Sequence, residues 1–480
     1  MPDSSILVAA VATAGALAAG ATALSHPRIA LGILFLLATV SRATLETPLG
    51  TMRPEMPAVA VVAAALLAGG RFSTIRRLPR STVGMALAFG TYLGVLALSS
   101  AFVAPGTAQS LRMVAWLAVS MTGGVVAFVL VRSRPVGAIE PLAFAGAAMG
   151  AVGIVVAVMF LVAGPAFHFG IQEPNSIVPR VFAFGWETNL YASFLAMCAF
   201  FALEAARGPR RKAGLVMLAL VLIGFPLGVT RGAYLGLAVG VVAYIAVRLA
   251  VERRPNDLPR FVIIAAALLV VGIVASNVLL PNALERGAAA GDPSGSPGPS
   301  VTQVPASTGT ATRPSEVPSA TPVPAVVPTP SLEAYPDTVA FRLERVTIAI
   351  GELPNSPLIG FGAESFGQRH PERHAGPGPD HIAIMAVVVP YEAGIIGAAA
   401  LLTGFVLLLT SLWKSARRSS RDADWRAVGA AAAFIGSLVS VLVAYQVTNA
   451  LHLAINWIVI GAAAALAVRD RPPDAASPGG

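Results

Sequence analysis

Cysteine is almost absent from the sequence, since Cys198 is the single cysteine among 480 residues and lies within an apolar run. One thiol cannot form an intramolecular disulfide, and a metal cluster held by several cysteines is excluded as well. Redox chemistry is therefore not expected. Charge is also scarce, because only 12% of the residues are charged while 56% are hydrophobic, with a mean hydropathy of +0.74. These values exclude an ordinary soluble globular domain and favour a protein whose main solvent is lipid.

Long apolar runs fill most of the chain. A bilayer core about 30 Å thick requires roughly 20 apolar residues in a helix, so the sequence predicts an all-α polytopic membrane protein with about 12 to 13 transmembrane helices. The predicted spans are 6–25, 29–41, 57–70, 82–103, 112–131, 141–164, 187–206, 213–229, 232–250, 261–280, 382–411, 427–446 and 452–468. The second and third are short enough to be tilted or partly re-entrant. The first lacks a basic leading segment and a good cleavage site, so a removable signal peptide is not expected.

Basic residues predict the orientation of the spans. The formal charge of +9 is spread between the apolar runs, which does not suit a nucleic-acid-binding face. Lysine and arginine instead occur in alternate short loops, and such loops are retained in the cytoplasm. The loops placed there carry Arg71, Arg76, Arg77 and Arg80; Arg132 and Arg134; Arg207, Arg210, Arg211 and Lys212; Arg248, Arg253, Arg254 and Arg260; and Lys414, Arg417, Arg418, Arg421 and Arg426.

This orientation divides the chain into four parts. Residues 1–280 hold transmembrane helices and an outward loop at 165–186, and 281–381 form one large extracytoplasmic loop. Within that loop, 287–335 is rich in Pro, Ser and Thr and is predicted to be a disordered insert, a solvated tether rather than a carrier of O-glycans. Residues 336–380 regain apolar side chains and are predicted to fold, beginning with an amphipathic helix on the membrane. C-terminal spans occupy 382–468, and a cytoplasmic tail occupies 469–480.

Arginines on the outward side are the first candidates for chemistry, because an arginine beside the membrane is costly unless it meets an anion. Arg231 lies in the turn 229–234, where its guanidinium and the following helix N-terminus can face one anion. A snorkelling arginine at the headgroup level fits the same spacing. Arg180 precedes the span that opens at 187, and an ordinary loop cation is its plainer interpretation. Arg342 lies on a helical face with Glu344, where an ion pair is the plainer interpretation.

Histidine supplies the candidate acid-base group. His381, with Asp380 beside it, lies just before a span and is the best candidate, although a structural histidine at the interface fits the position too. The spacing of His370, His374 and His381 is a weak metal signal. No H-E-x-x-H pattern accompanies these residues, so no metal is expected there.

Three outward segments together carry a family resemblance. The first has Arg180 followed by 185–192, with Gly185, Asn189 and Ala192 in a Gly-x-x-x-Asn-x-x-Ala pattern, and the second is Thr-Arg-Gly-Ala at 230–233. The third runs from Arg342 through Pro-Leu-x-Gly-x-Gly at 357–362 and His381 to Glu-x-Gly-x-x-Gly at 392–397. In order, side and approximate spacing, this series resembles the O-antigen ligase and polymerase superfamily, the membrane glycosyltransferases that act on polyprenyl-linked sugars.

The resemblance implies a GT-C-like fold and an extracytoplasmic reaction at a bacterial inner membrane. A glycan would pass from undecaprenyl diphosphate to an acceptor hydroxyl on a glycan, on lipid A-core or on a protein, without metal or other cofactor. Arg231 and Arg180 would hold the diphosphate with help from Arg342, and His381 would orient or deprotonate the hydroxyl. Further substrate-binding residues implied are Asn189, Tyr234 and Glu392.

Other functions fit the same sequence. Ligase and polymerase need the same donor site, so the residues do not choose between them, and a protein O-oligosaccharyltransferase would use it as well. A transporter or flippase of lipid-linked sugars would need polar residues near mid-membrane, such as Asn189, Gln446 and Asn456. A catalytically inactive scaffold follows if His381 has no catalytic role.

Overall fold

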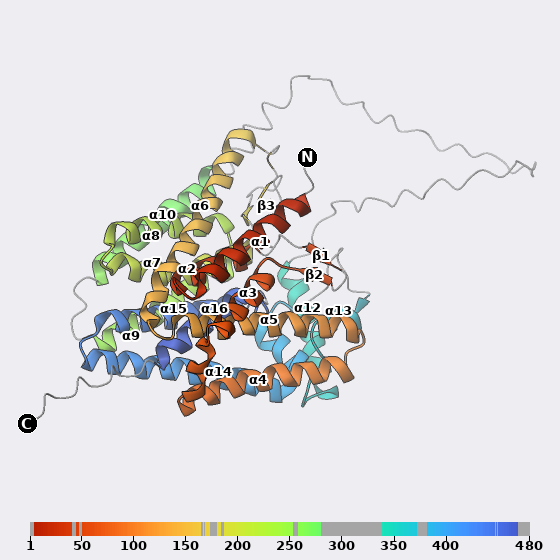
Figure 1. Cartoon of the computed structure of the whole chain (residues 1–480). Helices are drawn as coiled ribbons and strands as arrows, with labels where there is room; N and C mark the ends of the chain where they lie inside the picture. The colour runs from red at the N-terminus through yellow and green to blue at the C-terminus, as the bar shows by residue number, and fades with distance from the viewer. Residues whose placement is uncertain are drawn as a thin grey trace, which may run out of the picture.

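The computed structural model describes residues 4–40, 45–47, 50–164, 167, 169–172, 180–183, 187–252, 258–279, 338–371, 382–446, 448 and 450–468. Helices dominate these residues (Figure 1). The predicted disordered insert at 287–335 and the cytoplasmic tail at 469–480 lie outside the described residues.

The long helices follow one another in a single bundle. In chain order the first group is α1 (Ser4–Ala23), α2 (Pro27–Thr39), α3 (Glu55–Ala68), α4 (Arg80–Phe102), α5 (Thr107–Val131), α6 (Ile139–Ala163), α7 (Thr188–Arg207), α8 (Arg211–Gly224), α9 (Arg231–Val251) and α10 (Leu258–Val274). The second group is α12 (Thr338–Glu352), α13 (Ser365–Arg369), α14 (Met385–Arg421), α15 (Trp425–Ala444) and α16 (Ala454–Ala467).

Short elements connect the long ones. The 3-10 helices are η1 (Arg71–Arg77), η2 (Pro135–Ala138), η4 (Phe225–Gly228) and η6 (Leu353–Asn355), and a π-helical turn, η5 (Ala275–Leu279), follows α10. Two small antiparallel hairpins pair β1 (Leu45–Thr47) with β2 (Gly50–Met52), and β3 (Ile171–Gln172) with β4 (Arg180–Val181). The chain is therefore all-α with minor hairpins in the connections.

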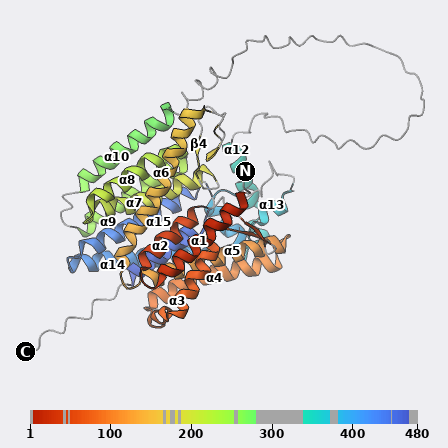
Figure 2. The same cartoon turned by 45° about the horizontal axis from the view of Figure 1, so that its top comes forward.

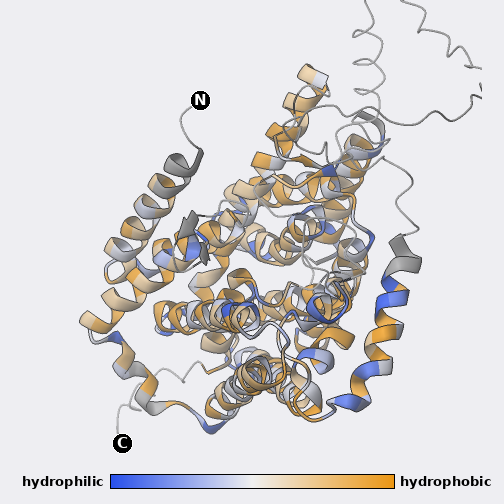
Figure 3. Ribbon diagram, turned by 90° about the vertical axis from the view of Figure 1, so that its right-hand side faces the viewer, coloured by the Kyte–Doolittle hydropathy of each residue, from blue (hydrophilic) through white to orange (hydrophobic). Residues whose placement is uncertain are grey.

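The outer surface of the bundle is apolar. Large side chains such as Phe102 and Val162, each 81% exposed, point away from the protein, and most of the bundle is hydrophobic in Figure 3. Within the described residues, nine helices are long and apolar enough to cross a membrane, and four shorter apolar helices accompany them. A helix satisfies its backbone hydrogen bonds internally, which is the requirement inside lipid. The chain is accordingly a multi-pass membrane protein, as the composition predicts.

Small residues allow the helices to pack closely. Gly236 and Gly240 of α9 face α15, where a methyl group would collide with the backbone oxygens of Ser440 and Gly436. Gly124 of α5 and Gly461 of α16 make a comparable approach to each other. In lipid no hydrophobic force draws helices together, so close backbone packing through small residues supplies much of the attraction.

The predicted spans correspond to helices of the bundle, with one notable difference in length. The span predicted at 382–411 is α14, a helix of 37 residues that continues to Arg421 and is interrupted at Gly394, whose φ of 62° and ψ of −173° are not helical. Hydropathy alone did not predict the break, because the apolar pattern runs through it. Pro390 lies one turn before it, and both residue types are known causes of helix kinks.

The sidedness inferred from the basic loops has a direct test. Cysteines placed at Ser133, in the α5–α6 loop, and at Asn355, in η6, lie at opposite ends of the bundle, and the native Cys198 is buried. We expect a membrane-impermeant maleimide to label Asn355→Cys in intact cells and Ser133→Cys only after permeabilisation. Labelling of both positions from one side would contradict the arrangement.

Candidate functional site

Segments that are distant in sequence meet at the end of the bundle opposite the basic loops. Figure 2 shows β4, α12 and α13 at this end. The connection at 445–453 joins several of them, since Thr448 donates a hydrogen bond to Glu187, just before α7, over 2.7 Å. At the start of α14, the backbone N–H group of Met385 donates to the Tyr445 carbonyl, and that of Ala386 donates to Gln446 Oε1. Both acceptors belong to the same connection. We call this region the outer end, after the side of the membrane that the basic loops predict for it.

The break in α14 is filled by another part of the chain. The N–H groups of Phe361 and Gly362 donate to the carbonyls of Tyr391 and Glu392 over 2.8 and 2.9 Å. On the far side of the break, the N–H groups of Ile395 and Ile396 donate to the carbonyls at 357 and 358. The segment 357–362 therefore replaces the helical partners that α14 lacks, and it joins the Pro-Leu-x-Gly-x-Gly and Glu-x-Gly patterns of the sequence directly.

We call the contact between the segment 357–362 and the break in α14 the joint. Glycine is required on both sides of this joint. Gly360 has a φ of 74°, and a methyl group there would lie 2.5 Å from the backbone of Glu392 and Gly394. At Gly394 a methyl group would overlap the Leu358 carbonyl, and the backbone conformation is one that almost only glycine adopts. The spacing of the glycines thus reflects a close approach of two backbones.

Beside the joint, Glu352 is the centre of a polar cluster. Its carboxylate accepts hydrogen bonds from Arg369 Nη2 over 3.0 Å and from the Tyr391 hydroxyl over 2.6 Å, and it contacts His370 Nε2 at 3.2 Å. The guanidinium of Arg369 also lies over the ring of Phe361, 4.2 Å from its centroid. The cluster ties the end of α12 to α13 and to the first half of α14.

The partners of Glu352 determine its charge. Burial by itself would raise the pKa of the carboxyl group, but the hydrogen bonds from Arg369, Tyr391 and His370 outweigh it and lower the pKa to about 2. Glu352 is therefore ionised at any physiological pH. It can hold His370 in one orientation, as carboxylates do for imidazoles in many enzyme sites.

A small cavity of about 100 Å³ lies behind this cluster. Its polar lining comes from Glu364, Glu392 and His452, and the rest is Tyr92, Leu96, Met113, Leu117, Ala363 and Leu451. Glu392, a predicted substrate-binding residue, accepts the backbone N–H of Glu364 over 2.9 Å. Its own carbonyl accepts the Ser99 hydroxyl. Glu392 therefore braces α13 and α4 against α14 as well as lining the cavity.

Arg231 is the first residue of α9, and its side chain is exposed. Among the described residues, its guanidinium has no ion pair or hydrogen bond. The preceding Thr230 is 4% exposed, and its hydroxyl oxygen has no hydrogen-bond partner within the same residues. Tyr234, one turn later, packs edge-on against Phe225 of η4 with ring centroids 4.9 Å apart. The helix start thus presents a cation, an N-terminus and an unpaired hydroxyl together.

Arg180 comes close to this helix start through the elements that carry it. It lies in β4, partly buried, and β4 packs against η4 and the beginning of α7. Since η4 leads directly into the turn before Arg231, the structure brings the surroundings of the two arginines together. Asn189, in the first turn of α7, is partly buried beside the same elements.

Two further predicted residues are less well connected to this group. Arg342 lies in the first half of α12, partly buried, with an interaction of its own. His381 lies outside the described residues, as do Asp380 and His374. The chain resumes at Ile382, which is fully buried against the outer end. Of the three histidines in the weak metal pattern, the structure describes His370, and its imidazole contacts Glu352.

Sequence reasoning missed the Glu352 cluster. Arg369 and Tyr391 have no distinctive spacing relative to Glu352, so no periodic pattern links them. The available signal was local, because Tyr391 directly precedes the predicted Glu392 and Glu352 precedes the turn-rich stretch at 354–362.

Comparison of the sequence with protein-family models and with curated proteins finds no match.

The glycine joint predicts a specific loss of stability. Gly394→Ala should destabilise the protein by about 1–3 kcal/mol or more, since the residue must keep its unusual backbone conformation and avoid the Leu358 carbonyl. Gly351→Ala in α12 is the control, because a methyl group there has nothing within 4 Å. Thermal unfolding in detergent should show a lower Tm for the first variant only; equal Tm values would contradict the joint.

The low pKa of Glu352 predicts a pH-dependent contribution to stability. A carboxyl group whose pKa falls on folding stabilises the folded state above its unfolded pKa near 4.5, and that contribution disappears as the pH falls toward about 2. Glu352→Gln should therefore cost roughly 1–3 kcal/mol at pH 7 and progressively less between pH 4.5 and pH 3.

Hydrogen exchange of α12 and α13 at pH 7, 4 and 3 measures this effect. Glu344→Gln on the exposed side of α12 is the matched control and should change protection by less than about 0.5 kcal/mol. A loss in Glu352→Gln that stayed constant with pH would argue against an ionised Glu352 in the cluster.

Proposed function

We propose that the protein transfers a glycan from a polyprenyl diphosphate to an acceptor hydroxyl at the outer face of a bacterial inner membrane, in the manner of O-antigen ligases and polymerases. The observation that carries the proposal is the convergence of the three resembling segments. They are separated by more than 100 residues in places, yet their described parts lie at one end of the bundle, and 357–362 is bonded directly to the break before Gly394.

The start of α9 is suited to a diphosphate. Arg231 is exposed and unpaired among the described residues, the helix N-terminus adds partial positive charge, and the buried Thr230 hydroxyl beside them has no hydrogen-bond partner within the same residues. Arg180, carried by β4 against η4, supplies a second guanidinium nearby. Planar guanidinium groups bind phosphate oxygens through two parallel hydrogen bonds, which suits a leaving group that gains negative charge.

The reaction requires one bond to form and one to break. The acceptor oxygen attacks the anomeric carbon of the donor sugar, and the bond from that carbon to the phosphate oxygen breaks. The electron pair leaves with the diphosphate, where Arg231 and Arg180 stabilise it and Arg342 assists. His381 accepts the proton of the acceptor hydroxyl, while Asn189, Tyr234 and Glu392 position the sugars and the loops around them.

The Glu352–His370 pair offers a second imidazole for the same step. Its contact of 3.2 Å with an ionised carboxylate holds the ring in one orientation. Parallel replacement of the two histidines therefore distinguishes the base from a structural residue.

Lipid-facing helices accommodate the polyprenyl chain in this proposal. The apolar outer surface around α9 and α14, with exposed Leu235, Ile395 and Ile396 near the outer end, provides a hydrophobic path beside the proposed diphosphate site. The GT-C-like class and the large extracytoplasmic loop belong to the same proposal, and they follow from the resemblance.

Replacement of Arg231 tests the proposal most directly. Arg231→Ala should lower the rate of transfer by about 100-fold or more while the protein stays folded and inserted, because loss of one preorganised charge stabiliser typically has that effect. The measurement is transfer by purified protein from a defined undecaprenyl-diphosphate donor. Arg112→Ala, an exposed arginine near the outer end of α5, is the matched control and should retain activity.

The outcomes separate the competing functions. Unchanged glycan product in Arg231→Ala would overturn the diphosphate site, and flipping of the lipid-linked sugar without transfer would identify a flippase instead. His381→Ala and His370→Ala, assayed side by side, identify the base by the larger loss of rate. In a deletion strain, long lipid-linked chains would indicate a ligase, and single repeats would indicate a polymerase.

A further inference from the structure

A large cavity lies at the other end of the bundle, among the basic loops. Its volume is about 760 Å³, and it is lined by the start of α2, η2, the α7–α8 turn, the end of α9 and the start of α15. This volume falls within the range of sites that hold small molecules. The cavity shares no residue with the proposed transfer site.

Its floor is a buried ionic network centred on Arg248. Arg248 is 2% exposed and lies between Glu252, 2.7 Å from its Nη2, and Glu204, 3.7 Å from its Nη1. The Tyr244 hydroxyl donates a hydrogen bond to Glu204. Among the described residues, Nε and Nη1 of Arg248 and Nη1 of Arg207 have no hydrogen-bond partner. The floor therefore retains unused donors beside its two carboxylates.

The rim of the cavity carries further positive charge. Arg28, Arg134 and Arg426 are exposed, and within the described part of the chain none of their guanidinium groups has an ion pair or hydrogen bond. The acidic side chains Asp424 and Glu140, which line the cavity, have other partners than these three arginines. Asp424 caps α15 by accepting the N–H of Ala427, and Glu140 faces Arg210 at 3.7 Å. The three rim arginines thus line one cavity from the start of α2, the connection before η2 and the start of α15, and none has a carboxylate partner among the described residues.

Close packing determines where one of these arginines lies. The guanidinium of Arg28 rests on the backbone of Gly137, and a methyl group at Gly137 would come within 2.5 Å of Arg28 Cζ. Glycine at this position therefore leaves room for the side chain to reach the cavity rim from the start of α2.

We propose that this cavity binds a phosphate-bearing anion from the side of the basic loops. Guanidinium groups match phosphate oxygens in geometry and charge, and three that have no partner in the described part of the chain line a cavity with space for a phosphorylated group between them. A phospholipid headgroup and a soluble phosphate compound share this chemistry.

Trp425 provides a reporter, because it lines the cavity and is 45% exposed. Tryptophan fluorescence of the full-length protein in phosphatidylcholine nanodiscs is titrated with inorganic pyrophosphate. In a second arm, phosphatidylglycerol replaces part of the phosphatidylcholine. A saturable change with pyrophosphate identifies a soluble ligand, and a change with phosphatidylglycerol alone identifies a lipid headgroup. Trp425→Phe should abolish either signal.

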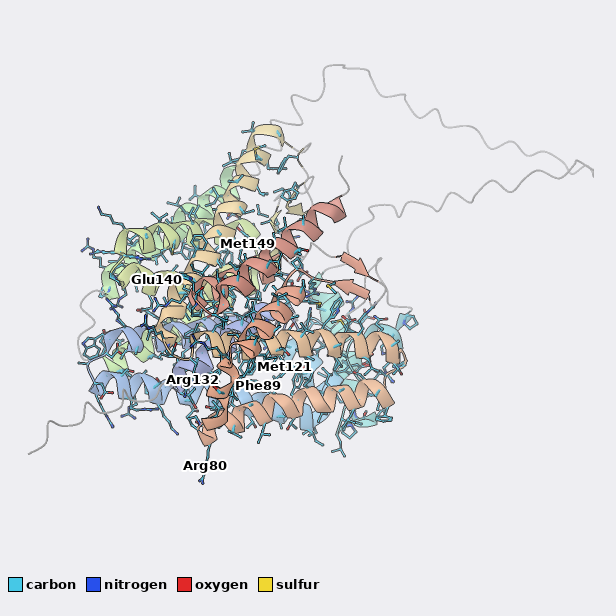
Figure 4. The ribbon with its side chains drawn as sticks, in the orientation of Figure 1. Arg80, Phe89, Met121, Arg132, Glu140 and Met149 are labelled. Atoms are coloured by element: carbon cyan, nitrogen blue, oxygen red, sulfur yellow. The ribbon has the colours of Figure 1, made fainter. Side chains whose placement is uncertain are left out.

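Two matched triple variants test the site itself. Arg28→Gln, Arg134→Gln and Arg426→Gln together should weaken binding at least about tenfold. The control replaces Arg80, Arg260 and Arg421 by Gln, which removes the same charge from the same end outside the cavity. Figure 4 shows Arg80 projecting away from the bundle. Gly137→Ala keeps every charge but displaces Arg28, so it should weaken binding as well.

The results have clear consequences. Loss of binding in the cavity variants with retention in the control supports the proposal. Equal loss in both triple variants would show that general surface charge attracts the anion and would overturn it, as would the absence of a saturable change with either probe. Circular dichroism and elution volume confirm folding, and Gly137→Ala gives a reading that is independent of net charge.

Discussion

The outer end depends on the backbone hydrogen bonds made across the break in α14. A helix in lipid cannot leave carbonyl and N–H groups unpaired, because water is not available to replace the lost partners. Here the segment 357–362 supplies those partners, and it can do so only because Gly360 and Gly394 permit the backbones to touch. The Glu352 cluster then fixes α12 and α13 beside the same joint, so the positions of Arg369, His370 and Tyr391 all follow from it.

Much of the bundle follows from the sequence, because burial in lipid leaves a simple signal. Apolar runs of sufficient length predicted the helices, including short ones such as α2 and α3. The break at Gly394 and the length of α14 were not predicted, since hydropathy is insensitive to a local change of backbone conformation. For the proposed site, the family resemblance pointed to Arg180, Arg231 and Glu392. The Glu352 cluster stayed hidden because its members meet only through tertiary packing.

The two ends of the bundle use charge in different ways. At the outer end, Arg231 is exposed, and its guanidinium has no ion pair among the described residues. At the basic end, Arg248 is already compensated by Glu204 and Glu252, and the free charge lies on the rim instead. Desolvation explains the contrast, since a fully buried arginine needs carboxylates at hand whereas an exposed one does not.

The length of α14 has a geometric consequence. A helix rises about 1.5 Å per residue, so the stretch from Gly394 to Trp413 measures roughly 30 Å, which matches the thickness of a hydrocarbon core. The arginines at 417, 418 and 421 lie beyond one boundary of this stretch, and their charges keep that end of the helix outside the hydrocarbon core. The break then lies about one hydrocarbon thickness from that boundary, which is the depth at which the proposed donor would carry the linkage between its sugar and its lipid.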